Sequence, residues 1–139
     1  MVSKYFKLDD KVYALEIDLN ELYANKRLRA KIGYTTKDMN KRIAGFRFSG
    51  NLKNQEHLVK KIFVSKNMLA KAIERIATEI AIVRGYERVN DKNLGLGYTE
   101  WFYCNGEQIK SCILQAYRIV NKEIKRGKKN GKKKRPKTT

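Results

Sequence analysis

The sequence predicts an α+β fold, in which a small antiparallel sheet of three or four strands in the N-terminal half packs against two amphipathic helices in the C-terminal half. Apolar and polar residues alternate within residues 12–19 and 26–34, which is typical of half-buried strands. From residue 69 onward apolar residues recur every three or four positions, as on one face of a helix. The Lys-rich C-terminus has almost no apolar content, which indicates disorder. We therefore expect one domain over residues 1–126 and a disordered basic tail over 127–139.

The first strands are expected close to the N-terminus. Residues 5–8 and 12–19 have the pattern of a short strand, a tight acidic turn and a longer strand. Because successive side chains of a strand point to opposite faces, one face of the longer strand should carry Tyr13, Leu15, Ile17 and Leu19.

The clearest strand pattern lies between residues 26 and 34. Apolar residues occupy one side, and Arg27, Arg29 and Lys31 occupy the other. A period of two predicts a half-buried strand with a basic outer stripe. The alternative is a helix over residues 19–32, favoured by a capping-box pattern at its start, but it leaves a poorly formed apolar stripe.

Residues 41–48 are expected to resume an extended conformation after a polar loop. Phe46 and Phe48 then share one face, with Arg47 opposite. Aromatic rings beside cations can stack nucleic-acid bases. We interpret these phenylalanines, and Trp101 further along the chain, as core residues instead.

Two helices are expected in the second half. Ser65 is a candidate N-cap for the first, and Gly85 is positioned to end it. The second should begin at Asn105, with Gln108 three residues later as in a capping box. A glycine-rich loop and a short aromatic strand should lie between them. The expected apolar stripes are Leu69, Ile73, Ile76, Ile80 and Val83 in the first helix, and Ile109, Cys112 or Ile113, Ala116, Val120 and Ile124 in the second.

The charge distribution indicates a polyanionic partner. The net charge is +18, and two blocks, residues 26–61 and 122–139, each carry +9. Nucleic acid is the commonest partner of such surfaces, because each neutralised phosphate releases counterions and strengthens binding. If the helices cover the apolar side of the sheet, its basic side is free to meet phosphates. The candidate nucleic-acid-binding residues are Arg27, Arg29, Lys31, Lys41, Arg42, Arg47, Lys125, Arg126, Lys128, Lys129, Lys132, Lys133, Lys134, Arg135 and Lys137.

Enzyme chemistry has weaker support in the sequence. Glu16 and Asp18 lie two apart on a strand and could share a divalent metal in a nuclease, with Asp9, Asp10 and Glu21 nearby in sequence. The chain has one histidine and two cysteines, so a zinc site of conventional composition is not expected and the cysteines should be reduced core thiols. No phosphate-binding loop occurs. We expect no catalytic residues and no cofactor.

These observations predict a non-enzymatic protein that binds DNA or RNA, of a kind found as phage or mobile-element accessory proteins. One alternative is a small basic inhibitor that docks on a host nucleoprotein enzyme, as anti-CRISPR proteins do, and another is the metal-dependent nuclease. With no membrane-spanning run or signal-peptide pattern, we expect an intracellular, cytoplasmic protein, or a nuclear one if it is eukaryotic, with no membrane partner. The oligomeric state and the choice between DNA and RNA stay open.

Overall fold

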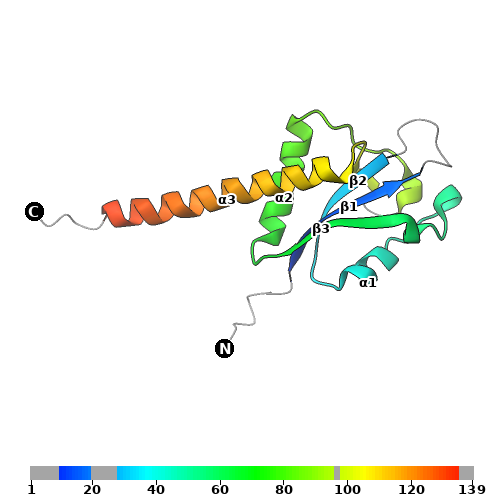
Figure 1. Cartoon of the computed structure of the whole chain (residues 1–139), viewed down its shortest axis with the longest axis horizontal. Helices are drawn as coiled ribbons and strands as arrows, with labels where there is room; N and C mark the ends of the chain where they lie inside the picture. Colours follow the sequence, from blue (N-terminus) through cyan, green and yellow to red (C-terminus); the bar gives the residue numbers. More distant parts are fainter. Residues whose placement is uncertain (1–9, 20–27, 96–97, 135–139) are drawn as a thin grey trace, which may run out of the picture.

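The fold is a four-stranded antiparallel sheet with strand order β3-β1-β2-β4, and this confirms the predicted α+β class (Figure 1). The computed structural model describes residues 10–19, 28–95 and 98–134, with only the backbone for Thr99 and for 128–134. The elements are β1 (Lys11–Asp18), β2 (Leu28–Thr35), α1 (Met39–Ala44), β3 (Val59–Lys66), α2 (Ala70–Val83), β4 (Trp101–Phe102), α3 (Gly106–Lys134) and the short 3-10 turns η1 (Gly50–Leu52), η2 (Glu56–Leu58), η3 (Lys92–Leu94) and η4 (Tyr98–Glu100).

The sheet is covered on both faces, whereas the sequence predicts one dry and one wet face. Val12 and Ala14 of β1 belong to a core shared with α2 and α3. Tyr13, Leu15 and Ile17 belong to a second core with residues of α1, η1, η3 and β4. The prediction of a wet face is therefore wrong, because β1 is a central strand with apolar residues at both parities, as expected for a strand buried on both faces.

Residues 41–48 do not form the predicted strand. Their first part lies in α1, whose N-terminus is capped by Asp38: the Oδ2 atom accepts hydrogen bonds from the backbone N–H groups of Asn40 at 3.0 Å and Lys41 at 3.4 Å. The remaining part is irregular, with Arg47 at φ 51°. The Asp38 cap satisfies backbone N–H groups that the first turn of a helix otherwise leaves unpaired, and this local signal favours helix over the short alternating pattern. Phe46 and Phe48 are buried, which confirms their interpretation as core residues.

The strand that the sequence misses is β3, and it changes where the first helix begins. Ser65 lies in β3 and caps no helix, so that prediction is wrong. The turn before α2 is organised by Asn67, whose Oδ1 atom accepts a hydrogen bond from the Leu69 N–H at 2.7 Å. Gly85 follows the helix at φ 85°, which confirms the predicted end.

The apolar stripe of α2 is rotated from the predicted one. The buried residues are Ile73 and three alanines, Ala70, Ala77 and Ala81. Val83, a member of the predicted stripe, is 85% exposed. Small side chains let a helix axis lie close to a sheet. Three of the four buried residues of α2 are therefore alanines.

The predicted start of the second helix is confirmed in detail. The Asn105 N–H donates to Gln108 Oε1, and the Gln108 N–H donates to Asn105 Oδ1, each at 2.8 Å. Glu16 adds a third contact, since its Oε2 atom accepts from the Gly106 N–H at 2.6 Å.

The helical backbone of α3 continues to Lys134, past the predicted domain limit at residue 126, and its C-terminal half projects away from the sheet (Figure 1). Lys and Arg favour helix, which is consistent with this extension; disorder of residues 127–139 stays a prediction.

Several other predictions are settled in part. Residues 28–34 form a strand, so the alternative helix is wrong there; residues 20–27 and the predicted first strand, 5–8, lie outside the described residues. Cys104 and Cys112 are buried free thiols, as predicted, and burial raises the pKa of Cys104 to about 12. Among the helices described, none is long and apolar enough to cross a membrane.

The rotated stripe of α2 can be tested by truncating one inner and one outer residue. Ile73→Ala is expected to lower the free energy of unfolding by about 2–5 kcal/mol, because it leaves a cavity against the sheet. Val83→Ala, the matched control, should change it by no more than about 0.5 kcal/mol. Urea unfolding of both variants measures the difference. Equal destabilisation would contradict the described orientation of α2.

Candidate active site

A polar cavity lies at the open part of the sheet edge. β4 pairs only with Ala30 and Lys31, so in the described chain the outer edge of β2 carries no strand beyond Lys31. A cavity of about 210 Å³ opens beside this edge. Elements on both sides of the sheet contribute to its walls, which come from β1, β2, α1, α2 and η4. The lining residues are Tyr13, Gly33, Tyr34, Arg42, Lys71, Glu74 and Glu100.

Tyr13 forms the inner wall because its strand partner is a glycine. Tyr13 and Gly33 face each other across β1 and β2, and a Cβ atom at Gly33 would overlap the phenol ring and hydroxyl of Tyr13. The Tyr13 hydroxyl oxygen accepts a hydrogen bond from Arg42 Nε at 3.2 Å. Burial raises the pKa of Tyr13, and the charge of Arg42 offsets part of this rise. The phenol is therefore protonated at neutral pH, with its own proton left for another acceptor.

Glu100 enters the cavity from η4 and is held by a buried lysine. Lys31 is only 2% exposed, and its Nζ atom donates to Glu100 Oε2 in a charged hydrogen bond. Burial lowers the pKa of Lys31, while the charge of Glu100 opposes that shift. The Glu100 side chain remains 47% exposed, so its carboxylate is shared between the ion pair and the cavity.

Glu74 is the second carboxylate of the cavity and has the perturbed titration expected of a reactive group. It projects from α2, half-buried, one turn after Lys71. Burial raises the pKa of Glu74 and the negative charge of Glu100 raises it further, against smaller opposing effects of Lys31, Arg75 and Lys71. A carboxylate shifted toward neutral pH is suited to exchange protons with water or substrate.

Two cations of the predicted basic outer stripe are buried instead of exposed. Arg29 and Lys31 are each 2% exposed, so their prediction as surface cations is wrong. Arg29 lies 3.6 Å from Asp91 through Nη2 and its Cζ atom lies 5.4 Å above the Tyr103 ring. The physical reason is the second layer: residues of 88–95 and 98–101 cover this face, and Asp91 and Glu100 among them pair with the cations.

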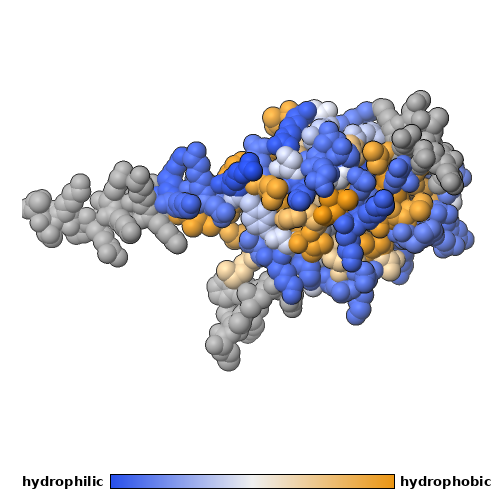
Figure 2. Space-filling view, in the orientation of Figure 1, coloured by the Kyte–Doolittle hydropathy of each residue, from blue (hydrophilic) through white to orange (hydrophobic). Residues whose placement is uncertain are grey.

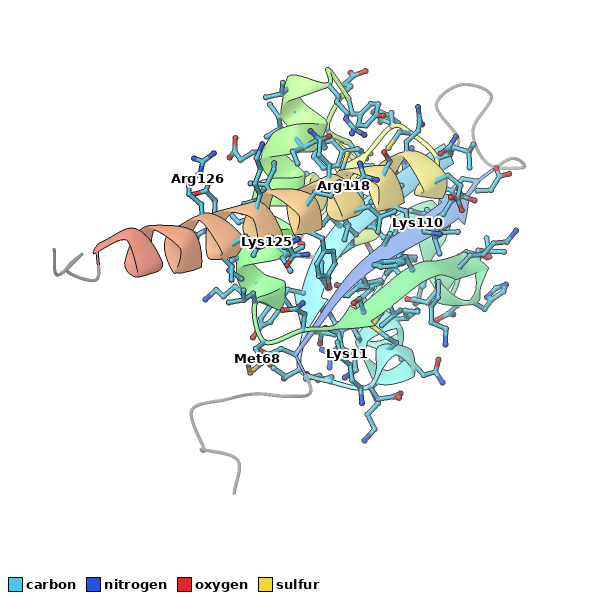
Figure 3. The ribbon with its side chains drawn as sticks, turned by 60° about the vertical axis from the view of Figure 1, so that its left-hand side comes forward. Lys11, Met68, Lys110, Arg118, Lys125 and Arg126 are labelled. Atoms are coloured by element: carbon cyan, nitrogen blue, oxygen red, sulfur yellow. The ribbon has the colours of Figure 1, made fainter. Side chains whose placement is uncertain are left out.

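The other predicted binding residues are dispersed. Arg42 lies in the cavity, whereas Lys41 and Arg47 are exposed beside it on and after α1. Lys125 and Arg126 are exposed on the projecting part of α3 (Figure 3). Only the backbone is described for Lys128, Lys129, Lys132, Lys133 and Lys134, all in α3, and Arg27, Arg135 and Lys137 lie outside the described residues.

The carboxylates that the sequence singles out do not form a site. Glu16 caps α3 through Gly106, Asp18 is exposed, and the Asp10 carboxylate accepts a hydrogen bond from the Tyr34 hydroxyl at 3.2 Å. Asp9 and Glu21 lie outside the described residues. Within the described ranges, no group of three or more His, Cys, Asp or Glu side chains is arranged to hold a metal ion.

Sequence reasoning identifies Arg42 but misses Tyr13, Lys71, Glu74 and Glu100 as site residues. One signal was present: a glycine inside a strand of branched residues marks a close approach of another group, and at Gly33 that group is the Tyr13 phenol. No signal connects Glu74 with Glu100, since 26 positions separate them and only the tertiary fold brings them to one cavity.

The match to a known family covers this whole cavity. The T5orf172 domain matches residues 11–116, well over half of the chain, and the protein belongs to the T5orf172 domain family. This phage-associated domain is often linked to nucleic-acid binding and nuclease activity, and it is consistent with the phage or mobile-element origin expected from the sequence. No curated protein and no solved structure matches the chain significantly.

The raised pKa of Glu74 has a measurable effect on stability. A carboxyl group whose pKa is higher in the folded than in the unfolded state destabilises the fold when ionised, so this destabilisation is present above the folded pKa and disappears as the pH falls below the unfolded value. Glu74→Gln is therefore expected to raise the melting temperature at pH 7 and to lose that advantage near pH 4. Glu79→Gln, an exposed change on the same helix, is the control. A lower melting temperature for Glu74→Gln at pH 7 would contradict the described environment.

Proposed function

We propose that the protein binds nucleic acid and hydrolyses a phosphodiester bond at the Tyr13–Arg42–Glu74 cavity. The observation that carries the proposal is the convergence of two phenols, two cations and two carboxylates on one cavity, inside the segment that belongs to a family linked to nucleic-acid binding and nuclease activity. The sequence-based expectation of a non-enzymatic protein stays untested. The cavity favours a catalytic role over it.

The cavity contains the groups that phosphodiester hydrolysis requires. The reaction places additional negative charge on the phosphoryl oxygens, removes a proton from the attacking water and supplies one to the leaving oxygen. Arg42 and Lys71 provide the positive charge, and the guanidinium of Arg42 keeps its charge throughout. Glu74 is the base for the water, since its pKa lies above the ordinary value.

Tyr13 has the features of the proton donor to the leaving oxygen. Its raised pKa keeps the phenol protonated before the reaction. The hydrogen bond from Arg42 Nε to its oxygen stabilises the phenolate that remains after the proton has left. The same hydrogen bond fixes the orientation of Arg42, so one contact serves both charge stabilisation and proton transfer.

A divalent cation fits the carboxylate side of the cavity. The ionised form of Glu74 is disfavoured by burial and by Glu100, and a bound cation would relieve both effects. Mg²⁺ is commonly held by one or two carboxylates together with water and substrate phosphates. Glu74, with Glu100 beside it, would hold the ion, which would add positive charge at the phosphoryl oxygens and lower the pKa of a bound water, so that Glu74 would not need to act as the base when the ion is present.

Cations on α3, a helix that contributes none of the described residues lining the cavity, are suited to contact a polyanion. Lys110, Arg118, Lys125 and Arg126 are distributed along α3 (Figure 3). The coloured part of α3 that projects beyond the body is mainly hydrophilic, with some hydrophobic surface on its lower side (Figure 2). Contacts between such cations and phosphates position a nucleic acid without reading its sequence. We infer that α3 and the Lys-rich C-terminus supply affinity, while the cavity supplies chemistry.

Cleavage by cavity variants tests the catalytic proposal. The wild-type protein with Mg²⁺ or Mn²⁺ is expected to cleave at least one of supercoiled plasmid, single-stranded DNA and RNA. Glu74→Gln, Tyr13→Phe and Arg42→Ala should each reduce the rate at least about 100-fold, because each removes a proton-transfer or charge-stabilising group. Gel assays measure the rates, and circular dichroism confirms folding.

Two exposed carboxylates serve as controls for this series. Glu79→Gln lies on the same helix as Glu74, and Asp18→Asn tests the strand carboxylates that the sequence suggests as a metal site. Both variants should cleave at the wild-type rate. Intact substrates with the wild-type protein under all these conditions would refute the catalytic proposal, and loss of activity in Asp18→Asn would move the site to the strand carboxylates Glu16 and Asp18.

Removal of residues 127–139 tests the contribution of the C-terminus to affinity. The truncation deletes seven Lys or Arg but leaves the exposed cations Lys41, Arg47 and Lys92 beside the cavity. Binding should weaken without being abolished, and its log–log salt slope should flatten by about 0.9 for each duplex phosphate that the protein no longer neutralises. Fluorescence anisotropy over a salt series measures both quantities. Complete loss of binding would show that the folded domain has no nucleic-acid surface of its own.

A further inference from the structure

A second and larger cavity adjoins the first. Its volume is about 740 Å³, within the range of pockets that bind small ligands. Arg42 and Glu100 line both cavities, so the two share a wall. The remaining side chains that line the larger cavity are a phenylalanine, a tyrosine and two cations: Phe46, Tyr98, Arg47 and Lys92.

The walls of this larger cavity are held in place by close backbone contacts. Gly95 has φ 79°, and a Cβ atom there would overlap the carbonyl oxygen of Phe46, so the two wall segments touch at a position where only glycine fits. The Ser49 N–H donates to the Asn93 carbonyl at 2.9 Å, and the Asp91 carboxylate accepts from the Asn93 N–H at 3.0 Å. These contacts hold residues 46–49 and 91–95, two of the segments that form the cavity wall, against each other.

Phe46 gives the cavity a fixed aromatic floor. Its ring is stacked on Phe48 with centroids 6.0 Å apart and meets Trp101 edge-on at 6.1 Å. The Arg42 guanidinium carbon lies 5.0 Å from the centroid of the Phe46 ring. These contacts immobilise Phe46, so the more exposed Tyr98 is the ring available to stack a flat ligand.

The charge of the cavity selects an anion. Among the described residues that line it, Arg42, Arg47 and Lys92 oppose one acid, Glu100, whose charge is already shared with Lys31. Arg47 is exposed and has φ 51°, in the left-handed region. Residues other than glycine adopt this conformation at a cost in free energy, and it is found most often at binding sites. A flat aromatic ring that carries an anionic group matches this lining, and a nucleotide has both parts.

We propose that the larger cavity binds an unstacked nucleotide of the nucleic-acid strand, next to the phosphodiester bond that enters the Tyr13 cavity. The base stacks on Tyr98, and its phosphate is held by Arg47 and Lys92. Because Arg42 borders both cavities, it contacts the two consecutive phosphates of one strand. The inference rests on the proposed function for the position of the cleaved bond, but the nucleotide site itself is a binding property that does not need cleavage.

The test uses the full-length chain carrying Glu74→Gln, so that binding is measured without cleavage. Single-stranded oligonucleotides containing 2-aminopurine are the probe, since stacking of this base quenches its fluorescence. Strong quenching is expected with the parent. Tyr98→Ala should remove the quenching and Tyr98→Phe should retain it, because the stacking face is kept.

The cation pair is tested with a variant that preserves the backbone. Arg47→Gly suits the left-handed conformation at that position, so Arg47→Gly/Lys92→Ala should fold at least as well as the parent. Its affinity for the oligonucleotide should fall about tenfold or more. The matched control is Lys53→Ala/Lys60→Ala, which removes two exposed cations that do not line the cavity and should have a smaller effect.

The possible results separate this inference from the proposed function. If the wild-type protein cleaves nucleic acid while Tyr98→Ala and Arg47→Gly/Lys92→Ala bind and quench like the parent, the nucleotide site is refuted and the catalytic proposal stands. If no nucleic acid is cleaved but the cavity variants lose quenching and affinity, the nucleotide site stands and the catalytic proposal fails. Equal affinity for adenosine monophosphate and for the oligonucleotide would overturn the assignment to a strand.

Discussion

The buried ion pair between Lys31 and Glu100 connects the features on which the structure depends. Lys31 projects from β2 into the second core, where the charge of Glu100 opposes the cost of burying its ammonium group. This contact holds η4 against the sheet, and η4 leads directly into β4 and then α3. The same carboxylate borders both cavities and raises the pKa of Glu74. Loss of the pair would leave a buried ammonium unpaired and release the wall that separates the two cavities.

The cavity also depends on β4 being only two residues long. A longer fourth strand would pair with all of β2 and close the edge at which the cavity opens. Because β4 ends after two residues, α2 on one side of the sheet and α1 on the other direct side chains to the same edge. Gly33 then lets the Tyr13 ring lie across β2, so a residue from the middle of the sheet reaches a site at its margin. The reactive groups of the cavity therefore come from elements that are distant in sequence.

Several elements were predictable because their signals are local. The helix start at Asn105 is encoded by residues three apart, and Gly85 ends α2 through its own backbone conformation. Residues 28–34 form a strand as their alternation indicates, but the same alternation gave the wrong environment for Arg29 and Lys31. Periodicity reports which side chains share a face, whereas burial of that face depends on whether another layer covers it. Here residues of 88–95 and 98–101 cover it, and Asp91 and Glu100 pair with the two cations.

The sequence by itself determined the fold class, the helix start at Asn105, the reduced state of the two thiols and the strongly basic character that favours a polyanionic partner. Each of these depends on composition or on contacts within a few residues. Only the tertiary structure decided which cations are buried and which are exposed, and only it brought Tyr13, Arg42, Glu74 and Glu100 to one cavity. The physical reason is that charge pairing and desolvation act between groups close in space, and these groups are distant along the chain.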